Sequence, residues 1–189
     1  MVHFLLRTVV LVLGLIISSS VANAANPGYR LIEWTDLIPP EDLEALLNPP
    51  DYVTAIEDGS IEDQIASQLN NIAAGRPDNR YEQALRSTAV RKEFAGQKVR
   101  LPGFIVPLDF NDEQRITSFF LVPWFGACLH LPPPPPNQII YADFNSGIGL
   151  EDIYSPYWLE GTLEVSLAET ELGTSAYLMH VNSVQPYME

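Results

Sequence analysis

The stretch KVRLPGFIVPLDFNDEQRITSFFLV, residues 98–122, has the pattern of two β-strands joined by a turn. Its first nine residues alternate well enough for a strand, and Pro102 and Gly103 inside them predict a bulge or a strong bend. The polar residues 110–115 are typical of a turn, and the apolar run 116–122 predicts a second strand. This part of the chain is therefore expected to form β-sheet.

Three later segments also have the composition of strands, namely QIIYADF (138–144), YWLEGTLEVSL (157–167) and SAYLMHVNSV (175–184). Glycines lie inside the first and fourth of the five predicted strands, at Gly103 and Gly161. Five short strands with such bends are typical of a small, strongly coiled Greek-key barrel. We expect an α+β fold, an OB-like five-stranded β-barrel preceded by two amphipathic helices. A five-stranded sandwich is the alternative.

The two helices are predicted before the strands. Ser60 is the expected cap of the first, whose isoleucines and leucines recur along one face until Gly75. The second is expected from Asp78 to Phe94, with basic residues in its C-terminal half. A shorter acidic helix is expected over residues 41–47, and it belongs to an N-terminal segment that lies over the domain.

Residues 1–24 have the three parts of a secretory signal: a basic start, an apolar run and the cleavage pattern Ala22-Asn23-Ala24. The apolar run is shorter than the ~20 residues that a spanning helix needs. We expect cleavage after Ala24, a periplasmic location and no membrane insertion afterwards; a retained membrane anchor is the alternative. The expected organisation is a signal peptide (1–24), an extended and helical strap (25–59), a helical hairpin (60–95) and an OB-like barrel (96–189), with 60–189 as one folded unit.

The charge of the chain excludes some classes of partner. Its 24 acidic and 10 basic residues give a formal net charge of −14. Such a surface repels phosphate backbones and anionic lipid headgroups. Nucleic-acid binding is therefore not expected, whereas cations and basic partners are compatible with the composition.

The stretch FFLVPWFGACLHLPPPPPNQIIY, residues 119–141, contains the only cysteine and five consecutive prolines. Cys128 and His130 lie on one face if the backbone is extended, so a thiolate and an imidazole would bind one ion there. Zinc is the favoured metal and copper the alternative. His180, on the last predicted strand, is the third candidate ligand. Oxygen ligands are available from Asp109, Asp143 or Asn137.

The same stretch supports two other hypotheses. Cys128 has no cysteine partner in the chain, so it is either metal-bound, paired with another molecule, or buried and inert. A cysteine nucleophile with His130 as base is the least favoured, because no nucleophile elbow or glycine-rich oxyanion loop is visible. In the docking hypothesis a rigid apolar ledge binds a partner protein. The ledge consists of Trp124, Phe125, Pro132, Pro133, Pro134, Pro135, Pro136, Asn137 and Gln138.

Four motifs resemble a family of bacterial exported proteins, domain-of-unknown-function family 3299. They are WTDLIP (34–39), GFIVPLDFN (103–111), FLVPWFGACLHLPPPPPNQIIY (120–141) and YLMHVNSVQPY (177–187). The resemblance implies an accessory protein that acts with an ABC-type envelope transport system, in metal handling or transporter assistance. It carries over no activity. Cys128, His130 and the segment 132–138 map onto the family motif.

Overall fold

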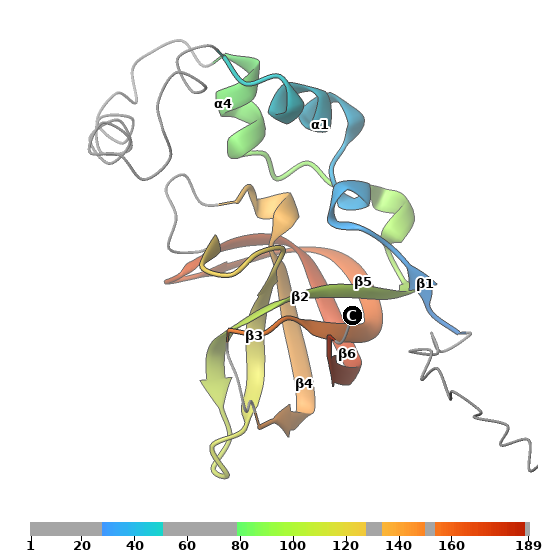
Figure 1. Cartoon of the computed structure of the whole chain (residues 1–189), viewed down its shortest axis with the longest axis vertical. Helices are drawn as coiled ribbons and strands as arrows, with labels where there is room; N and C mark the ends of the chain where they lie inside the picture. Colours follow the sequence, from blue (N-terminus) through green and yellow to red (C-terminus); the bar gives the residue numbers. More distant parts are fainter. Residues whose placement is uncertain (1–27, 51–78, 128–133, 150–153, 188–189) are drawn as a thin grey trace, which may run out of the picture.

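The computed structural model describes residues 28–50, 79–127, 134–149 and 154–187. It is a small domain with a β-barrel and a few short helices (Figure 1). All five predicted strands are present, and four of them are longer than expected. The elements in chain order are β1 (Arg30–Leu31), η1 (Trp34–Leu37), α1 (Pro40–Leu47), α4 (Arg80–Leu85), η2 (Lys92–Phe94), β2 (Gln97–Phe110), β3 (Ile116–Val122), η4 (Pro136–Gln138), β4 (Ile140–Ile148), β5 (Tyr157–Thr170) and β6 (Gly173–Pro186).

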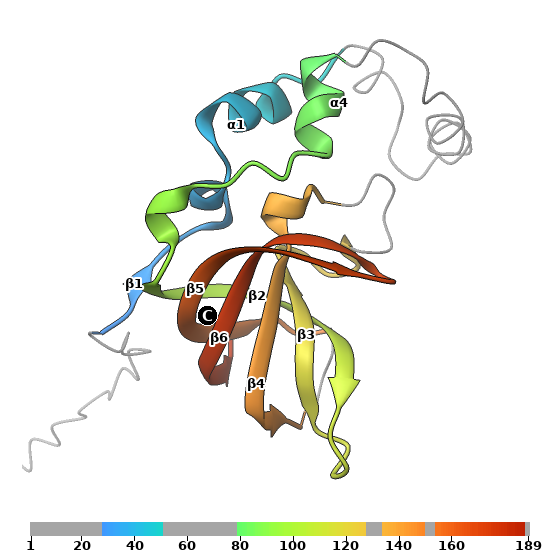
Figure 2. The same ribbon diagram turned by 180° about the vertical axis from the view of Figure 1, so that it is seen from behind.

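The five long strands close into a barrel. Their order is β2-β3-β4-β6-β5, and β2 pairs with β5 to complete the ring (Figure 2). Strands β4 and β6 are parallel, and the other pairs of the ring are antiparallel. The short β1 adds to β2 in parallel, from outside the ring. Closure leaves few unpaired strand edges.

The interior of the barrel follows from the alternation of side chains along each strand. On β3, Phe119 and Leu121 are fully buried in the main core, with Leu101 of β2 and Tyr177 of β6. Successive side chains of a strand point to opposite faces, so the residues between them lie on the outer face. The apolar pattern of the sequence therefore fixes which face of each strand points inward.

Gly161 of β5 lies where two strands approach closely. A Cβ atom there would be 2.5 Å from the carbonyl oxygen of His180 on β6, a distance that real Cβ atoms do not adopt. The β5–β6 register also shifts next to Gly161. Gly103 of β2 is similarly crowded, at 2.9 Å from the carbonyl oxygen of Val122. The two mid-strand glycines thus permit the tight coiling that their positions in the sequence predict.

The N-terminal segment packs directly on the barrel. The amide of Ile32 donates to the Arg100 carbonyl at 3.0 Å, and the Trp34 indole Nε1 donates to the Pro102 carbonyl at 2.7 Å. Leu37 is fully buried in the main core. The domain boundaries expected from the sequence stay a prediction, although these contacts join the segment to the barrel.

A buried tyrosine connects three parts of the chain. The Tyr177 hydroxyl donates to the Leu37 carbonyl at 2.9 Å and accepts from the Arg91 amide at 2.7 Å. Burial raises the pKa of Tyr177 to about 12, because desolvation penalises the phenolate. The phenol therefore stays protonated, and it can donate this hydrogen bond at any physiological pH.

The helical part is shorter than predicted. The expected helix over 78–94 is wrong beyond Leu85, where α4 ends. Ser87 Oγ accepts from the Ala89 amide at 3.1 Å, a local bond that competes with helix formation. The carbonyl of Ala89 accepts from Asn137 Nδ2 at 3.0 Å, so the backbone here finds partners outside a helix. The short helix of the strap is confirmed as α1.

The helix expected from Ser60 to Gly75 lies outside the described residues, as does the segment 1–24. Among the helices that the structure describes, none has the length and apolar composition needed to cross a membrane. Helices α1 and α4 contact each other, and the buried Asp42 of α1 forms an ion pair with Arg80 of α4.

Candidate binding surface on the outer face of the barrel

A second apolar cluster covers the outer face of β2, β3 and β4, separate from the core. Phe120 and Val122 of β3 are fully buried in it, although they point away from the barrel interior. Both faces of β3 are therefore apolar, which requires other residues to cover the outer one. The remaining members are Ala127, Ile139, Phe104, Val106, Leu108 and Tyr141.

Three exposed aromatic side chains lie at one end of this cluster. Trp124 is 46% exposed, Phe125 47% and Tyr154 67%. The ring of Phe125 packs edge-on against Phe104 at 6.1 Å between centroids, and lies 5.0 Å from the Tyr154 ring. We call Trp124, Phe125 and Tyr154 the aromatic surface. The Phe125 ring is held by its contacts with Phe104 and Tyr154, and about half or more of each of the three side chains remains open to solvent.

The end of the proline segment is buried. Pro134 and Pro135 are buried, and so are Asn137 and Gln138. Asn137 Nδ2 donates to the Ala89 carbonyl and Gln138 Nε2 donates to the Trp34 carbonyl at 2.8 Å. These two amides were expected to bind a partner, but here they join η4 to the N-terminal elements.

The centre of the expected metal site is not among the described residues. Cys128, His130, Pro132 and Pro133 fall in the undescribed segment 128–133, so the Cys-x-His hypothesis is untested. The described residues contain no group of three or more His, Cys, Asp or Glu side chains placed to bind a metal.

His180 lies on the outer face of β6, beside Asp143 of the parallel strand β4. Its Nδ1 is 2.8 Å from Asp143 Oδ2 and 3.0 Å from Oδ1. A carboxylate in this position favours the tautomer with hydrogen on Nδ1 and leaves Nε2 with its lone pair. Both side chains remain substantially exposed. The sequence analysis named both residues as candidate ligands of one site, but it did not predict that they contact each other, because the contact depends on the register of two strands far apart in the chain.

At the other end of the outer cluster is a pocket of about 310 Å³. Leu108 and Asp109 of β2 both line it, because a bulge at Leu108 interrupts the usual alternation between Pro107 and Asp109. Asp109 Oδ2 accepts from Ser118 Oγ at 2.5 Å. We call this the acidic pocket. Its lining residues are Leu108, Asp109, Tyr141, Thr170, Glu171 and Leu172.

Sequence reasoning missed most of this pocket. Asp109 was considered only as a metal ligand, and Glu171 and Leu172 fall between the predicted strands 157–167 and 175–184, with no role expected for them. The turn between β5 and β6 reaches the outer face near Phe120. A Cβ atom added to Gly173 would lie 3.9 Å from the Phe120 ring. No local pattern in the sequence predicts that meeting, because about 50 residues separate the two segments.

Comparisons with known proteins agree with the motifs. The family model of DUF3299, proteins of unknown function, matches residues 34–186. A crystal structure of a DUF3299 family protein from Pseudomonas aeruginosa PAO1 is 34% identical, with a TM-score of 0.62. The match covers 85% of this chain and 97% of that protein. No curated protein matches.

Proposed function

The chain belongs to the DUF3299 family of proteins of unknown function, and we propose that it is an exported binding protein that docks a partner protein through its aromatic surface. The observation that carries this proposal is the exposure of Trp124, Phe125 and Tyr154, with Phe125 packed between Phe104 and Tyr154. An exported location and a partner in an ABC-type envelope transport system are part of the same proposal.

Exposed aromatic rings that lie side by side leave a contiguous apolar area in water, which is unfavourable unless a partner covers it. Neighbouring apolar side chains on a surface are typical of interaction sites. Tryptophan and tyrosine contribute much of the binding energy at protein interfaces, because they bury a large area and lose little conformational freedom. Phe125 is already held between Phe104 and Tyr154. A partner would therefore meet a surface that needs little rearrangement.

The barrel topology supports an OB-like assignment within this proposal. The ring order is β2-β3-β4-β6-β5, with β4 and β6 parallel and β2 paired with both β3 and β5. This order supports the assignment, because an OB-type Greek-key barrel pairs its first strand with its second and its fourth. Such barrels use the outer face of their second and third strands for binding. Here those strands are β3 and β4, which carry the outer apolar cluster.

The test is a double variant, Trp124→Ala with Phe125→Ala, in a tagged protein recovered from the cell envelope. Because a central interface aromatic contributes about 2 kcal/mol or more, recovery of the specific partner should fall by more than tenfold. The matched control is Phe110→Ala, since Phe110 is 55% exposed on the β2–β3 hairpin. Equal recovery by the double variant and the wild type would show that docking does not use this surface.

Metal binding at Cys128 and His130 is a second candidate, with zinc favoured over copper. The observation in its favour is the His180–Asp143 pair, since histidine ligands commonly donate their other ring N–H to a carboxylate. His180 Nε2 would then be a third ligand. Neutral imidazole and thiolate are both ligands that zinc accepts.

Elemental analysis of the purified protein tests the metal proposal. The wild type should hold near-stoichiometric zinc or copper, and Cys128→Ser should lose most of it, because the thiolate is the strongest of the proposed ligands. His180→Ala should lose less. Metal absent from the wild type after reconstitution under reducing conditions would exclude the site and leave Cys128 as an ordinary thiol.

A further inference from the structure

The acidic pocket has the size of a site for one long side chain. Its volume of about 310 Å³ is at the lower end of the ~300–1,000 Å³ range of small-ligand pockets. Three lining residues, Leu108, Tyr141 and Leu172, offer apolar surface. Asp109 lies on β2, and Glu171 lies in the turn between β5 and β6, so the two carboxylates come from distant parts of the chain. A ligand that fits must therefore combine an apolar stem with a positive head.

Hydrogen bonds fix the Asp109 side chain and the turn that contains Glu171. Asp109 is oriented by the Ser118 hydroxyl. Glu171 lies in the turn between β5 and β6, where Thr170 Oγ1 donates to the Gly173 carbonyl at 3.1 Å and accepts from the Leu172 amide at 3.2 Å. These bonds hold the turn in one shape, so less conformational entropy is lost when a ligand binds.

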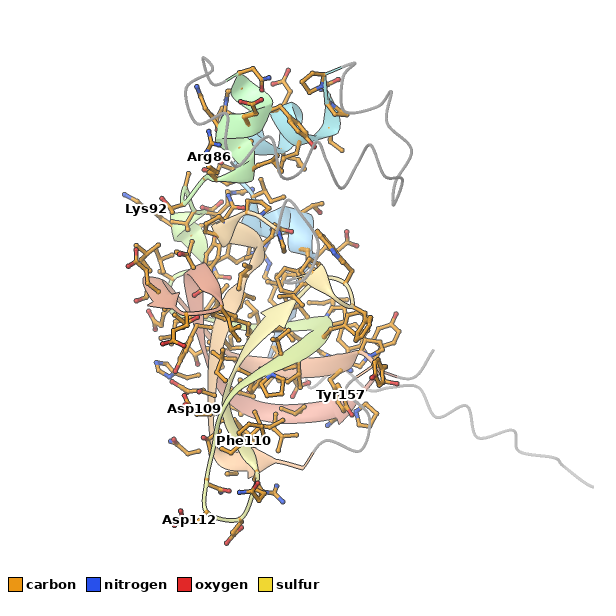
Figure 3. The ribbon with its side chains drawn as sticks, turned by 90° about the vertical axis from the view of Figure 1, so that its left-hand side faces the viewer. Arg86, Lys92, Asp109, Phe110, Asp112 and Tyr157 are labelled. Carbon is orange, nitrogen blue, oxygen red and sulfur yellow. The ribbon has the colours of Figure 1, made fainter. Side chains whose placement is uncertain are left out.

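The electrostatic balance of the pocket is negative. None of its six lining residues carries a positive charge. Figure 3 shows that Arg86 and Lys92 lie toward the helical end of the molecule, whereas Asp109 lies lower on the barrel. The whole chain adds a formal net charge of −14. A cation is therefore attracted both by the pocket and by the surrounding protein.

The pocket is continuous with the aromatic surface. Phe104, Val106 and Leu108 belong to the outer cluster and follow one another along β2. Phe104 contacts Phe125 of the aromatic surface, while Leu108 lines the pocket. The four residue-to-residue steps from Phe104 to Leu108 span about 13 Å at the usual rise of a strand. One extended segment of a partner would reach both ends.

We propose that the acidic pocket binds an arginine or lysine side chain of the partner segment that docks on the aromatic surface. This inference rests on the proposed function and adds the chemistry that the partner must have. The methylene stem packs between Leu108, Tyr141 and Leu172, as long basic side chains do on apolar surfaces. The charged head lies between Asp109 and Glu171.

The experiment uses N-acetyl-arginine amide as the probe and N-acetyl-citrulline amide as its uncharged analogue. Both are titrated into isotope-labelled protein while amide NMR shifts are followed. We expect the arginine probe to shift the amides of Leu108, Asp109, Tyr141 and Leu172 saturably, with a dissociation constant on the order of millimolar. The citrulline probe should cause little change at the same amides.

Variants of the two carboxylates make the test specific. Asp109→Asn and Glu171→Gln should each weaken arginine binding about two- to fivefold, as expected for partly exposed ion pairs. The double variant should bind arginine and citrulline equally. Glu169→Gln is the matched control, because Glu169 is exposed on the same hairpin outside the pocket, and it should bind as the wild type does.

Two results would overturn the inference: arginine shifts that citrulline reproduces, or arginine shifts that the double variant retains. Free lysine amide, in place of arginine, separates a general cation site from one that needs a guanidinium fork. The titration involves neither Trp124 nor Phe125. Its failure would leave docking on the aromatic surface untouched, and loss of the docking proposal would leave the titration result valid.

Discussion

Gly161 shows how single residues decide the curvature of this barrel. Its hydrogen lies where a methyl group would meet the His180 carbonyl oxygen at 2.5 Å, so the crossing of β5 and β6 depends on the missing side chain. The sequence predicted this role, because a glycine inside a strand is unfavourable unless a bend or close approach requires it. Contacts such as those of Tyr177 were not predictable in this way, because their partners lie 86 and 140 residues away.

Tyr177→Phe tests the largest pKa shift in the described part of the protein. At neutral pH the variant should lose about 1–3 kcal/mol of unfolding free energy, because the Leu37 carbonyl and the Arg91 amide each lose a buried partner. Chemical denaturation of the two proteins measures this loss. An unchanged midpoint and slope would mean that water replaces the hydroxyl at no cost.

The same residue predicts how stability depends on alkaline pH. The pKa of Tyr177 is raised to about 12 in the folded protein, from 10.0 in the unfolded chain. The unfolded chain therefore loses this proton first, and the stabilisation is complete below pH 10 and is lost as pH rises through 12. Denaturation at several pH values should show a steeper alkaline fall for the wild type than for Tyr177→Phe. Parallel curves would contradict the shift.

At the scale of elements, the segment after α4 shows why strands were predicted better than helices. The strands were predicted from the alternation of apolar and polar residues, a local pattern that is visible in the sequence whichever strands pair with one another. The helix over 78–94 was predicted from spacing, but the residues after Leu85 bond to Asn137 and Tyr177, which spacing does not reveal. The tertiary contacts override the local preference.

Asn137→Ala tests whether the end of the proline segment serves the fold. Removing the side chain leaves the Ala89 carbonyl without the donor seen at 3.0 Å, which should cost about 1–3 kcal/mol. We also expect faster hydrogen exchange over residues 86–94, since η4 would no longer fix that segment. The control is Asn145→Ala, because Asn145 is exposed in the C-terminal half of β4. Equal stability of both variants would show that Asn137 is not needed there.

At the scale of the molecule, the sequence predicted a β-barrel with helices, but it indicated only part of the proposed binding surface. Trp124 and Phe125 were expected in the docking hypothesis as part of a rigid apolar ledge, and their role in binding stays a prediction. The acidic pocket was not, because it requires the bulge at Leu108 and the β5–β6 turn to meet. A one-residue bulge hardly changes the hydrophobic periodicity of a strand, so it is difficult to predict from the sequence. The contact between two distant segments does not change the periodicity at all.

The strap and the barrel are expected to unfold as one unit. Leu37 of η1 is fully buried in the barrel's core, so Leu37→Ala should cost about 2–5 kcal/mol, whereas Leu47→Ala, at an exposed position, should cost little. If the unit is cooperative, the amides of Ile32 in the strap and Phe119 in the barrel exchange with the same free energy, and Leu37→Ala lowers both equally. Native-state hydrogen exchange measures the two values. A lower value for Ile32 alone would mean that the strap detaches from an intact barrel, and the variant would then weaken only the attachment of the strap.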